Sequence, residues 1–314
     1  MRRTFNELAL PFAMRRNLHK SLLADVRWNG VIWYAPSIFL GPMENSLKQA
    51  SRCRSYLIIR DNFPEWAVDM GLMGRGLPYR FFKAVERYQY SVADVIGVQT
   101  PPNLPYFSRA GLKPSQRVEV LQNWLAHAAN VACSISVANS ALAERTIFVY
   151  AGNMGVAQGV GILIDLAERL RSRDDIGFLF VGRGSDAKVP RDDASQRGLA
   201  KVVFHDEIEP EEILGLYAQC HAGIVALDPR HKTHNIPGKF FTYMQAGLPV
   251  LASINPGNDL IQLIEQERVG RVCTDQSVDS LERLVAQLVG DIKAYTDLSA
   301  RCQALSARLF APGP

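Results

Sequence analysis

A glycine-rich turn in the second half of the sequence could hold a phosphate. It runs Gly-Asn-Met-Gly-Val-Ala-Gln-Gly over residues 152–159 and lies between an expected strand and an expected helix near Val156–Arg171. Glycines let a backbone approach an anion closely, and a helix N-terminus presents free amides and the positive end of its dipole. A tight turn without a ligand is the alternative, because the dinucleotide pattern Gly-x-Gly-x-x-Gly is not matched. The candidate contacts are Gly152, Asn153, Gly155 and Gln158.

Two further loops could complete a diphosphate site. The turn at 182–186 carries Arg183, which could face a phosphate or be a solvated loop arginine. The polar loop 228–239 leads into a helix whose first turn holds Lys239, so a full charge adds to the helix dipole. This loop offers His234, Asn235, Pro237, Gly238 and Lys239 as further contacts for the ligand that carries this diphosphate.

No metal is expected at these loops. His231 and His234 have no carboxylate at ligand spacing apart from Asp228, and no Asp-x-Asp occurs anywhere in the chain. The charge of a leaving diphosphate must then be balanced by Lys239, by helix ends and by Arg183.

The first half offers candidate sugar contacts directly after an apolar strand, in Arg-Asp-Asn-Phe-Pro-Glu-Trp at 60–66. Asp61 and Glu65 could orient sugar hydroxyls, and Trp66 could stack on a sugar ring. A capped helix start is an equal alternative, with Asp61 as N-cap and Pro64 in the first turn.

The elements that position these loops alternate between apolar strands and amphipathic helices, as in a parallel sheet wrapped by helices. The second half forms a complete doubly wound domain, and the first half gives a thinner signal of the same kind. We expect α/β architecture with two Rossmann-like domains, the N-terminal one shortened, over residues 1–140 and 141–314. The expected strands are 30–34, 55–60, 95–98, 117–121, 146–151, 176–181, 202–205, 223–227 and 249–253, and the expected later helices are 239–246, 259–268 and two within 277–309.

Composition narrows the functional classes. The net charge of +4 is too small to indicate nucleic-acid binding, and five scattered cysteines fit a reducing cytosol. No apolar run is long enough to span a bilayer, and the opening apolar stretch lacks a signal-peptide cleavage site. An anionic membrane surface is a candidate partner for the N-terminal cations, with a solvated helix face as the alternative. These cations are Arg2, Arg3, Arg15, Arg16, Lys20 and Arg27.

The sequence resembles family 4 of the retaining glycosyltransferases, which have the GT-B fold, and particularly the bacterial enzymes of lipopolysaccharide, O-antigen and capsule synthesis. The resemblance rests on the phrases at 34–39, 60–66, 93–100, 150–159 and 234–253, and it covers nearly the whole chain. It implies that the turn at 152–159 binds the donor diphosphate and that the loop at 234–253 passes beneath the donor sugar. It also implies that the family's opening strand and glycine-rich acceptor loop are missing from this chain.

Several positions depart from the family pattern. His234 and Thr242 stand where many members have two glutamates, and Asn153 and Gln158 stand near the usual Arg and Lys. Arg60 lies close to where a histidine is common. We therefore expect Lys239, Arg60 and Asp61 to be the catalytic residues, with Asp61, Glu65 and Trp66 binding the acceptor.

The resemblance implies a metal-independent, retaining hexosyltransferase that needs no cofactor besides its substrate, a nucleoside diphosphate sugar that is expected to be UDP-linked. The acceptor would be a lipid-linked glycan in surface polysaccharide synthesis, reached in the cytoplasm at the inner face of the cytoplasmic membrane. The alternatives are a catalytically inactive nucleotide-sugar-binding or partner subunit and a nucleotide-sugar epimerase.

Overall fold

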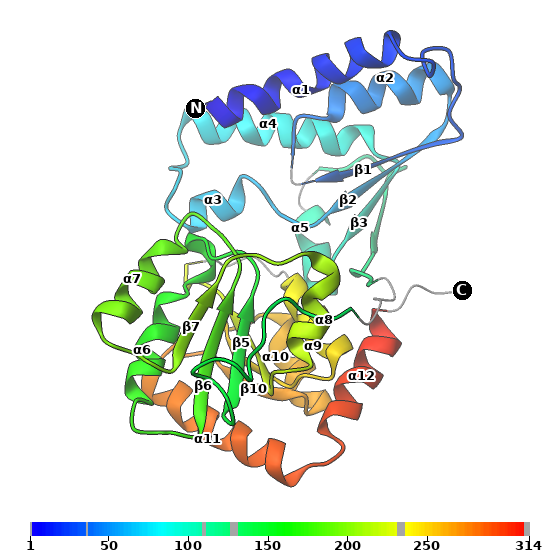
Figure 1. The fold of residues 1–314 in the computed structure, drawn as a ribbon. Helices are drawn as coiled ribbons and strands as arrows, with labels where there is room; N and C mark the ends of the chain where they lie inside the picture. The colour runs from blue at the N-terminus through cyan, green and yellow to red at the C-terminus, as the bar shows by residue number, and fades with distance from the viewer. Residues whose placement is uncertain (1, 36, 109–110, 126–130, 231–235, 311–314) are drawn as a thin grey trace. The chain divides into compact units, whose positions relative to one another are not determined.

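The computed structural model describes residues 2–35, 37–108, 111–125, 131–230 and 236–310. The chain divides into two compact units, one of residues 1–122 with 232–235 and one of residues 123–231 with 236–314 (Figure 1). The second unit begins before the predicted boundary at 140/141, because Ile135 and Val137 are already buried in its core.

The first unit contains a four-stranded parallel sheet in the sequential order β1-β2-β3-β4. Its strands are β1 (Gly30–Ala35), β2 (Arg54–Ile59), β3 (Val95–Val98) and β4 (Arg117–Val120), close to the predicted ranges. Its helices are α1 (Arg2–His19), α2 (Gly41–Ser51), α3 (Glu65–Asp69), α4 (Leu77–Val92) and α5 (Leu104–Ser108), with a 3₁₀ turn η1 (Pro101–Asn103) before α5.

The core of the first unit lies on one face of this sheet. Alternate residues of β1 point into it, and Val31 and Trp33 pack with Tyr90 and Val92 of α4. On the opposite face of β1, Ile32 and Tyr34 are 71% and 52% exposed.

The second unit contains a six-stranded parallel sheet in the order β10-β9-β8-β5-β6-β7. Its strands are β5 (Thr146–Ala151), β6 (Ile176–Val181), β7 (Val202–His205), β8 (Ala222–Ala226), β9 (Val250–Ser253) and β10 (Gly270–Cys273). Taken in sequence order from β5, this is the 3-2-1-4-5-6 arrangement of Rossmann domains. The prediction of two parallel α/β sheets is confirmed, although the edge strand β10 was not expected from its sequence.

Helices cover both faces of this sheet because successive residues of β5 point to opposite sides. Val149 packs with α8 (Ile213–Tyr217), α9 (Gly238–Ala246), α10 (Asp259–Glu267) and α12 (Leu298–Leu309). Phe148 and Tyr150 face α6 (Gly161–Arg169), α7 (Lys188–Gln196) and α11 (Val278–Ala294). Two 3₁₀ turns, η2 (Val156–Gln158) and η3 (Pro210–Glu212), precede α6 and α8.

Candidate functional site

The candidate donor site lies at the carboxyl ends of β5 and β8. These two strands are neighbours in the sheet, yet the chain leaves β5 toward β6 on one side and leaves β8 toward β9 on the other. Ligands of open α/β sheets bind outside the strand ends at such a reversal of direction. The loops after β5 and β8, the two that sequence analysis assigned to the donor, are therefore brought to the expected ligand-binding position.

The loops after β5 and β6 interlock through backbone contacts that only glycine permits. Gly182 has φ +141°, and a Cβ there would lie 2.1 Å from the carbonyl oxygen of Gly152. Gly184, with φ +159°, would likewise clash with Met154. The Met154 amide donates to the Arg183 carbonyl at 2.8 Å. The two glycine turns thus form one rigid backbone platform.

Lys239, in the first turn of α9, directs its ammonium group onto this platform. Its Nζ lies 3.3 Å from the centroid of the Tyr150 ring. The end of its side chain also lies against Gly152, with Cε 3.7 Å from where a Cβ of that glycine would stand. Nζ is buried and has no hydrogen-bond partner among the described residues. Burial lowers the pKa of this ammonium well below its usual value.

A buried ammonium without an anionic partner is electrostatically unfavourable, and the ring of Tyr150 offsets only part of the cost of removing it from water. An anion arriving at the platform would supply the missing partner. This is the feature of the second unit that most directly indicates a phosphate-binding function.

Gln158 closes part of the first glycine turn. Its Oε1 accepts hydrogen bonds from the Gly155 amide at 3.0 Å and from Asn153 Nδ2 at 3.1 Å. The amide of Gly155, expected to face a phosphate, is therefore engaged within the turn. The expected helix from Val156 was placed too early: only the 3₁₀ turn η2 forms there, because Gly159 adopts φ +57°, and α6 begins at Gly161.

Arg183 lies at the surface instead of over the platform. Its Nε is 2.8 Å from Glu207 Oε2, and both side chains are more than half exposed. This geometry matches the solvated alternative for Arg183, although an exposed pair of this kind is weak and could be exchanged for a stronger anion.

The loop after β8 is anchored before it reaches α9. Asp228 accepts a bidentate pair of hydrogen bonds from Arg230, and its own amide donates to the Ala157 carbonyl at 2.9 Å. Pro237 is the residue before α9, which begins at Gly238. His234 and Asn235, also predicted as donor contacts, lie outside the described residues.

In the first unit, the predicted acceptor residues occupy the end of β2 and the start of α3. Arg60 is buried, and its guanidinium donates to the Leu121 carbonyl at 2.6 Å. Asp61 is exposed, and α3 begins only at Glu65 after Pro64. The capped-helix alternative is therefore wrong in detail, since neither Asp61 as N-cap nor Pro64 within the first turn is observed.

Glu65 belongs to a polar cluster that sequence analysis did not detect. Lys83 Nζ lies 2.7 Å from Glu65 Oε1 and 2.6 Å from Glu86 Oε2. The Tyr106 hydroxyl lies within hydrogen-bonding distance of both carboxylates, 3.0 Å from Glu65 Oε2 and 2.6 Å from Glu86 Oε1. Glu86 is fully buried, and desolvation raises its pKa despite the adjacent ammonium. The Glu65 carboxylate, expected to bind sugar hydroxyls, is thus already engaged in holding α3, α4 and α5 together.

Trp66 follows Glu65 in α3 and is partly exposed. Its ring packs against Phe63 with centroids 6.0 Å apart.

Tyr150 is the residue of the donor region that sequence analysis missed. Its position two residues before the first loop glycine, at the end of a strand, was the available signal.

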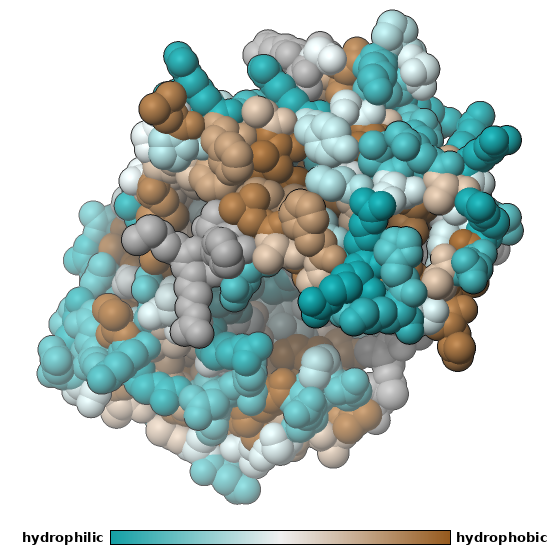
Figure 2. All heavy atoms as spheres, turned by 90° about the horizontal axis from the view of Figure 1, so that it is seen from above, coloured by the Kyte–Doolittle hydropathy of each residue, from teal (hydrophilic) through white to brown (hydrophobic). Residues whose placement is uncertain are grey.

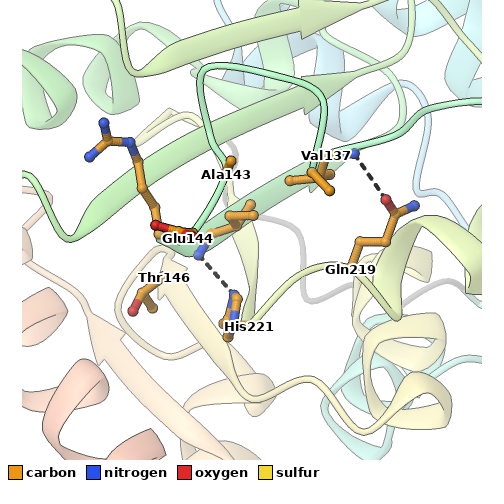
Figure 3. Close-up of a pocket in the computed structure, with 9 residues that line it drawn as sticks. Val137, Ala143, Glu144, Thr146, Gln219 and His221 are labelled. Carbon is orange, nitrogen blue, oxygen red and sulfur yellow. Dashed lines mark hydrogen bonds between the residues drawn. The ribbon is translucent and has the colours of Figure 1, made fainter.

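A separate cavity of about 470 Å³ lies at the amino ends of β5 and β8, the opposite end of the sheet from the platform. Its polar groups are used in backbone contacts (Figure 3): His221 Nδ1 accepts from the Ile147 amide at 3.0 Å, and Gln219 Oε1 accepts from the Val137 amide at 2.9 Å. Burial lowers the pKa of His221. These contacts fix the turn before β5 and give the cavity a structural role.

In the described part of the chain, no group of three or more His, Cys, Asp or Glu side chains is arranged to hold a metal ion. None of the helices in that part combines the length and apolar character needed to traverse a bilayer.

Comparison with known proteins relates the second unit to a family. Residues 145–291 match the family model described as Glycosyl transferases group 1. WbjE of Pseudomonas aeruginosa, named as a glycosyltransferase, is 22% identical over 255 residues, which are 77% of this chain and 61% of that protein. WcaI of Escherichia coli (strain K12), named as a colanic acid biosynthesis glycosyl transferase, is 24% identical over 300 residues, 88% of this chain and 72% of that protein. The chain thus spans less than two thirds of the first of these relatives.

Solved structures extend the likeness to both units. HepE of Anabaena, solved in complex with UDP and glucose, has a TM-score of 0.71 at 15% identity and covers 96% of this chain and 77% of its own. WaaG, a glycosyltransferase involved in lipopolysaccharide biosynthesis, has a TM-score of 0.63 at 16% identity, with coverages of 84% and 76%. The predicted GT-B fold and the predicted resemblance to glycosyltransferases are both confirmed.

Proposed function

We propose that the chain transfers a sugar from a nucleoside diphosphate donor to a glycan acceptor in surface polysaccharide synthesis, a function supported by the match of residues 145–291 to the Glycosyl transferases group 1 model. The single observation that carries the proposal is the buried Lys239 ammonium over the glycine platform, which lacks an anionic partner among the described residues. A donor diphosphate has the charge to fill this role. UDP as the nucleotide is supported by the ligand of HepE, and a role in polysaccharide synthesis is supported by the names of WcaI and WaaG, which refer to colanic acid and lipopolysaccharide biosynthesis. We propose a lipid-linked glycan as the acceptor.

The reaction that we propose needs no metal and no cofactor besides the donor. The bond between the anomeric carbon and the diphosphate oxygen breaks, and the acceptor oxygen bonds to that carbon on the same face. The departing diphosphate oxygen takes the acceptor hydroxyl's proton, so the configuration is retained without a protein base. Lys239 stabilises the charge that develops on the diphosphate as the bond breaks.

Substitution of the lysine tests the proposal directly. Lys239→Ala is expected to weaken UDP binding, measured by calorimetric titration, by more than tenfold, or roughly 1.4 kcal/mol. Lys293→Ala removes an exposed lysine from α11 of the same unit and should leave the affinity unchanged. Equal UDP affinity in wild type and Lys239→Ala would remove the lysine from the site.

A catalytically inactive nucleotide-sugar-binding subunit is the second candidate. It is favoured by the engagement of the Gly155 amide with Gln158 and by Thr242, whose hydroxyl donates to the Lys239 carbonyl at 3.0 Å where many family members carry a glutamate. Incubation with UDP-sugars and a lipid-linked acceptor separates the functions. Transfer that persists in excess chelator supports the enzyme, whereas binding without turnover supports the subunit and interconversion of free donor sugars supports an epimerase.

A further inference from the structure

The outermost strand of the second sheet, β10, borders a cavity of about 420 Å³. The rest of the lining comes from the end of α10, from α11 and from the start of α12, all in the yellow-to-red part of the ribbon in Figure 1. Protein sites for small molecules commonly have volumes of this order. The cavity is therefore large enough for a small organic ligand.

The cavity is separate from the donor platform. In the sheet order, β9 and β8 lie between β10 and β5. Arg268, in the lining, comes just before β10 begins at Gly270, so the cavity reaches the amino end of that strand. The platform lies at the carboxyl ends of β5 and β8. A ligand in the cavity would therefore leave the platform free.

Three arginine side chains line the cavity, and only one of them is hydrogen-bonded to a carboxylate. Arg271 donates from Nε and Nη2 to Asp291 at 2.7 Å and 2.9 Å, a pair that joins β10 to α11. Arg301 Nε is buried without a hydrogen-bond partner among the described residues, and Asp297 Oδ2 lies 3.6 Å from it, beyond hydrogen-bonding distance. The Arg268 side chain forms no hydrogen bond or ion pair with any residue that the structure describes.

Arg268 also adopts a backbone conformation that arginine seldom takes. It is the C-cap of α10, with φ 52°, in the left-handed region where glycine or asparagine usually ends a helix. A cation at a helix C-terminus interacts favourably with the helix dipole, which explains one arginine at this place. The dipole does not explain the second unpaired guanidinium, that of Arg301.

The acids of the lining do not balance these charges. Glu265 and Asp291 stand against three arginines, and Asp291 is already paired with Arg271. The remaining lining includes Leu284 and Leu288 of α11 and the ring of Tyr295, which lies 5.5 Å from the Arg301 guanidinium carbon. The cavity thus combines an excess of positive charge with apolar and aromatic surface.

The edge of β10 adds backbone donors. The carbonyls of Val269 and Cys273 accept hydrogen bonds from the β9 side, from Val250 and Ile254. Because the direction of backbone groups alternates along a strand, the amide of Val272 points away from β9, toward the uncovered edge. An anion in the cavity could accept a hydrogen bond there.

We infer that this cavity binds a small organic anion that bears a phosphate group. A guanidinium presents a planar fork of donors that matches phosphate oxygens and forms short, charge-assisted hydrogen bonds with them. Arg268 and Arg301 have these donors unused, while the leucines and Tyr295 can contact a less polar part of the ligand. Surface hydropathy does not indicate such a site, since Figure 2 shows hydrophobic (brown) and hydrophilic (teal) surface lying next to one another in the view from above.

The inference goes beyond the proposed function, because it adds a second ligand site to the unit that carries the donor platform. Inorganic phosphate is the probe, titrated by calorimetry at constant ionic strength. The titrations use the whole chain with Lys239→Ala, so that the platform contributes least to the signal. We expect this chain to bind phosphate. Adding Arg268→Gln and Arg301→Gln should weaken the binding roughly tenfold or more, and adding Arg268→Gln alone should weaken it about threefold.

A matched control adds Arg169→Gln and Arg283→Gln instead, which makes the same change in net charge at exposed residues outside the cavity. This control should keep the phosphate affinity. Thermal unfolding without phosphate checks that each variant is folded, and the exposed Arg268 decides the matter if the Arg301 change destabilises the unit. In the chain that retains Lys239, Arg268→Gln with Arg301→Gln should leave UDP affinity unchanged, so the two proposals fail separately.

Three results would overturn the inference. The first is a Lys239→Ala chain that does not bind phosphate. The second is equal phosphate affinity in the cavity variants and in the Arg169 and Arg283 control. The third is a loss of UDP affinity in Arg268→Gln with Arg301→Gln as large as that in Lys239→Ala, which would mean that the cavity is not a separate site.

Discussion

Each unit holds a lysine ammonium largely away from solvent, partly buried at Lys83 and buried at Lys239, but the surroundings of the two charges differ. In the first unit, Lys83 lies within 2.7 Å of two carboxylates, those of Glu65 and Glu86. In the second unit, Lys239 contacts the face of the Tyr150 ring and has no hydrogen-bond partner in the described part of the chain. The charge of Lys83 is compensated within the fold, whereas that of Lys239 has no such partner among the residues that the structure describes.

The difference distinguishes a lysine that stabilises the fold from a lysine whose charge is best explained by a ligand. A compensated charge stabilises the fold, because removing one partner of a buried ion pair leaves the other charge buried without compensation. An uncompensated charge adds nothing comparable to stability, so its presence is explained better by a ligand than by the fold. Mutation should therefore affect stability strongly at Lys83 and ligand binding strongly at Lys239.

The largest effect is expected for Lys83→Ala. Loss of the ammonium leaves Glu86 fully buried without its cation, so the free energy of unfolding should fall by about 3–5 kcal/mol. Urea unfolding followed by tryptophan fluorescence would measure it, because Trp28, Trp33 and Trp66 all lie in the first unit. Lys20→Ala, at an exposed lysine of the same unit, should change the value by less than about 0.5 kcal/mol.

A second variant tests whether the compensation is electrostatic. Lys83→Met combined with Glu86→Leu removes both charges and should recover much of the stability that Lys83→Ala loses. If the single and double variants were equally unstable, packing and not charge pairing would explain the role of Lys83.

The sequence predicted most of the fold because its strands are short apolar runs between turn residues. It failed at β10, where Gly270 and Arg271 dilute the apolar signal of an edge strand. It also failed at the start of α6, where Gly159 takes a left-handed conformation that the sequence alone does not require. Both failures concern conformations that neighbouring elements select.

The charged residues of the candidate site could be predicted from the sequence, but the side chains that contact them could not. Lys239 could be identified from its place at the start of a helix after a polar loop. Its contact with Tyr150 joins α9 to β5, elements that are far apart in the sequence, and only the sheet order brings them together. Similarly, Lys83 and Glu86 are neighbours on one helix, whereas Glu65 and Tyr106 join them from α3 and α5.

The next largest effect on the free energy of unfolding is expected at Glu44 of α2, a buried acid that does not follow the contrast drawn between the two units. It is a buried charge of the first unit that forms no ion pair with any described residue, and burial raises its pKa to about 7. Between pH 4.5 and 7 the folded state therefore holds a proton that the unfolded state releases, so stability falls as pH rises through this range. The free energy of unfolding should fall by up to about 3 kcal/mol between pH 4.5 and 7.

The measurement is the difference in unfolding free energy between wild type and Glu44→Gln at several pH values. The glutamine variant should lack this part of the decline between pH 4.5 and 7, while Asp25→Asn, at an exposed acid of the same unit, should follow the wild type. Parallel curves for wild type and Glu44→Gln would mean that Glu44 titrates normally. A lone buried acid can thus be neutralised by a proton near neutral pH without any ligand.

The smallest effect on stability, and the sharpest test of the comparison, is expected for Lys239→Met. Methionine fills a similar volume without charge, so the free energy of unfolding should stay the same or rise by about 1 kcal/mol, although UDP binding should weaken as it does in Lys239→Ala. The lowered pKa of Lys239 also determines the direction in which stability changes with pH. Below pH 10.5 the unfolded state binds a proton more readily than the folded state. The wild type should therefore gain stability relative to Lys239→Met as pH rises toward 10.5. A methionine variant that is several kcal/mol less stable at neutral pH would show that Lys239 is compensated within the fold after all, and the distinction between the two lysines would no longer hold.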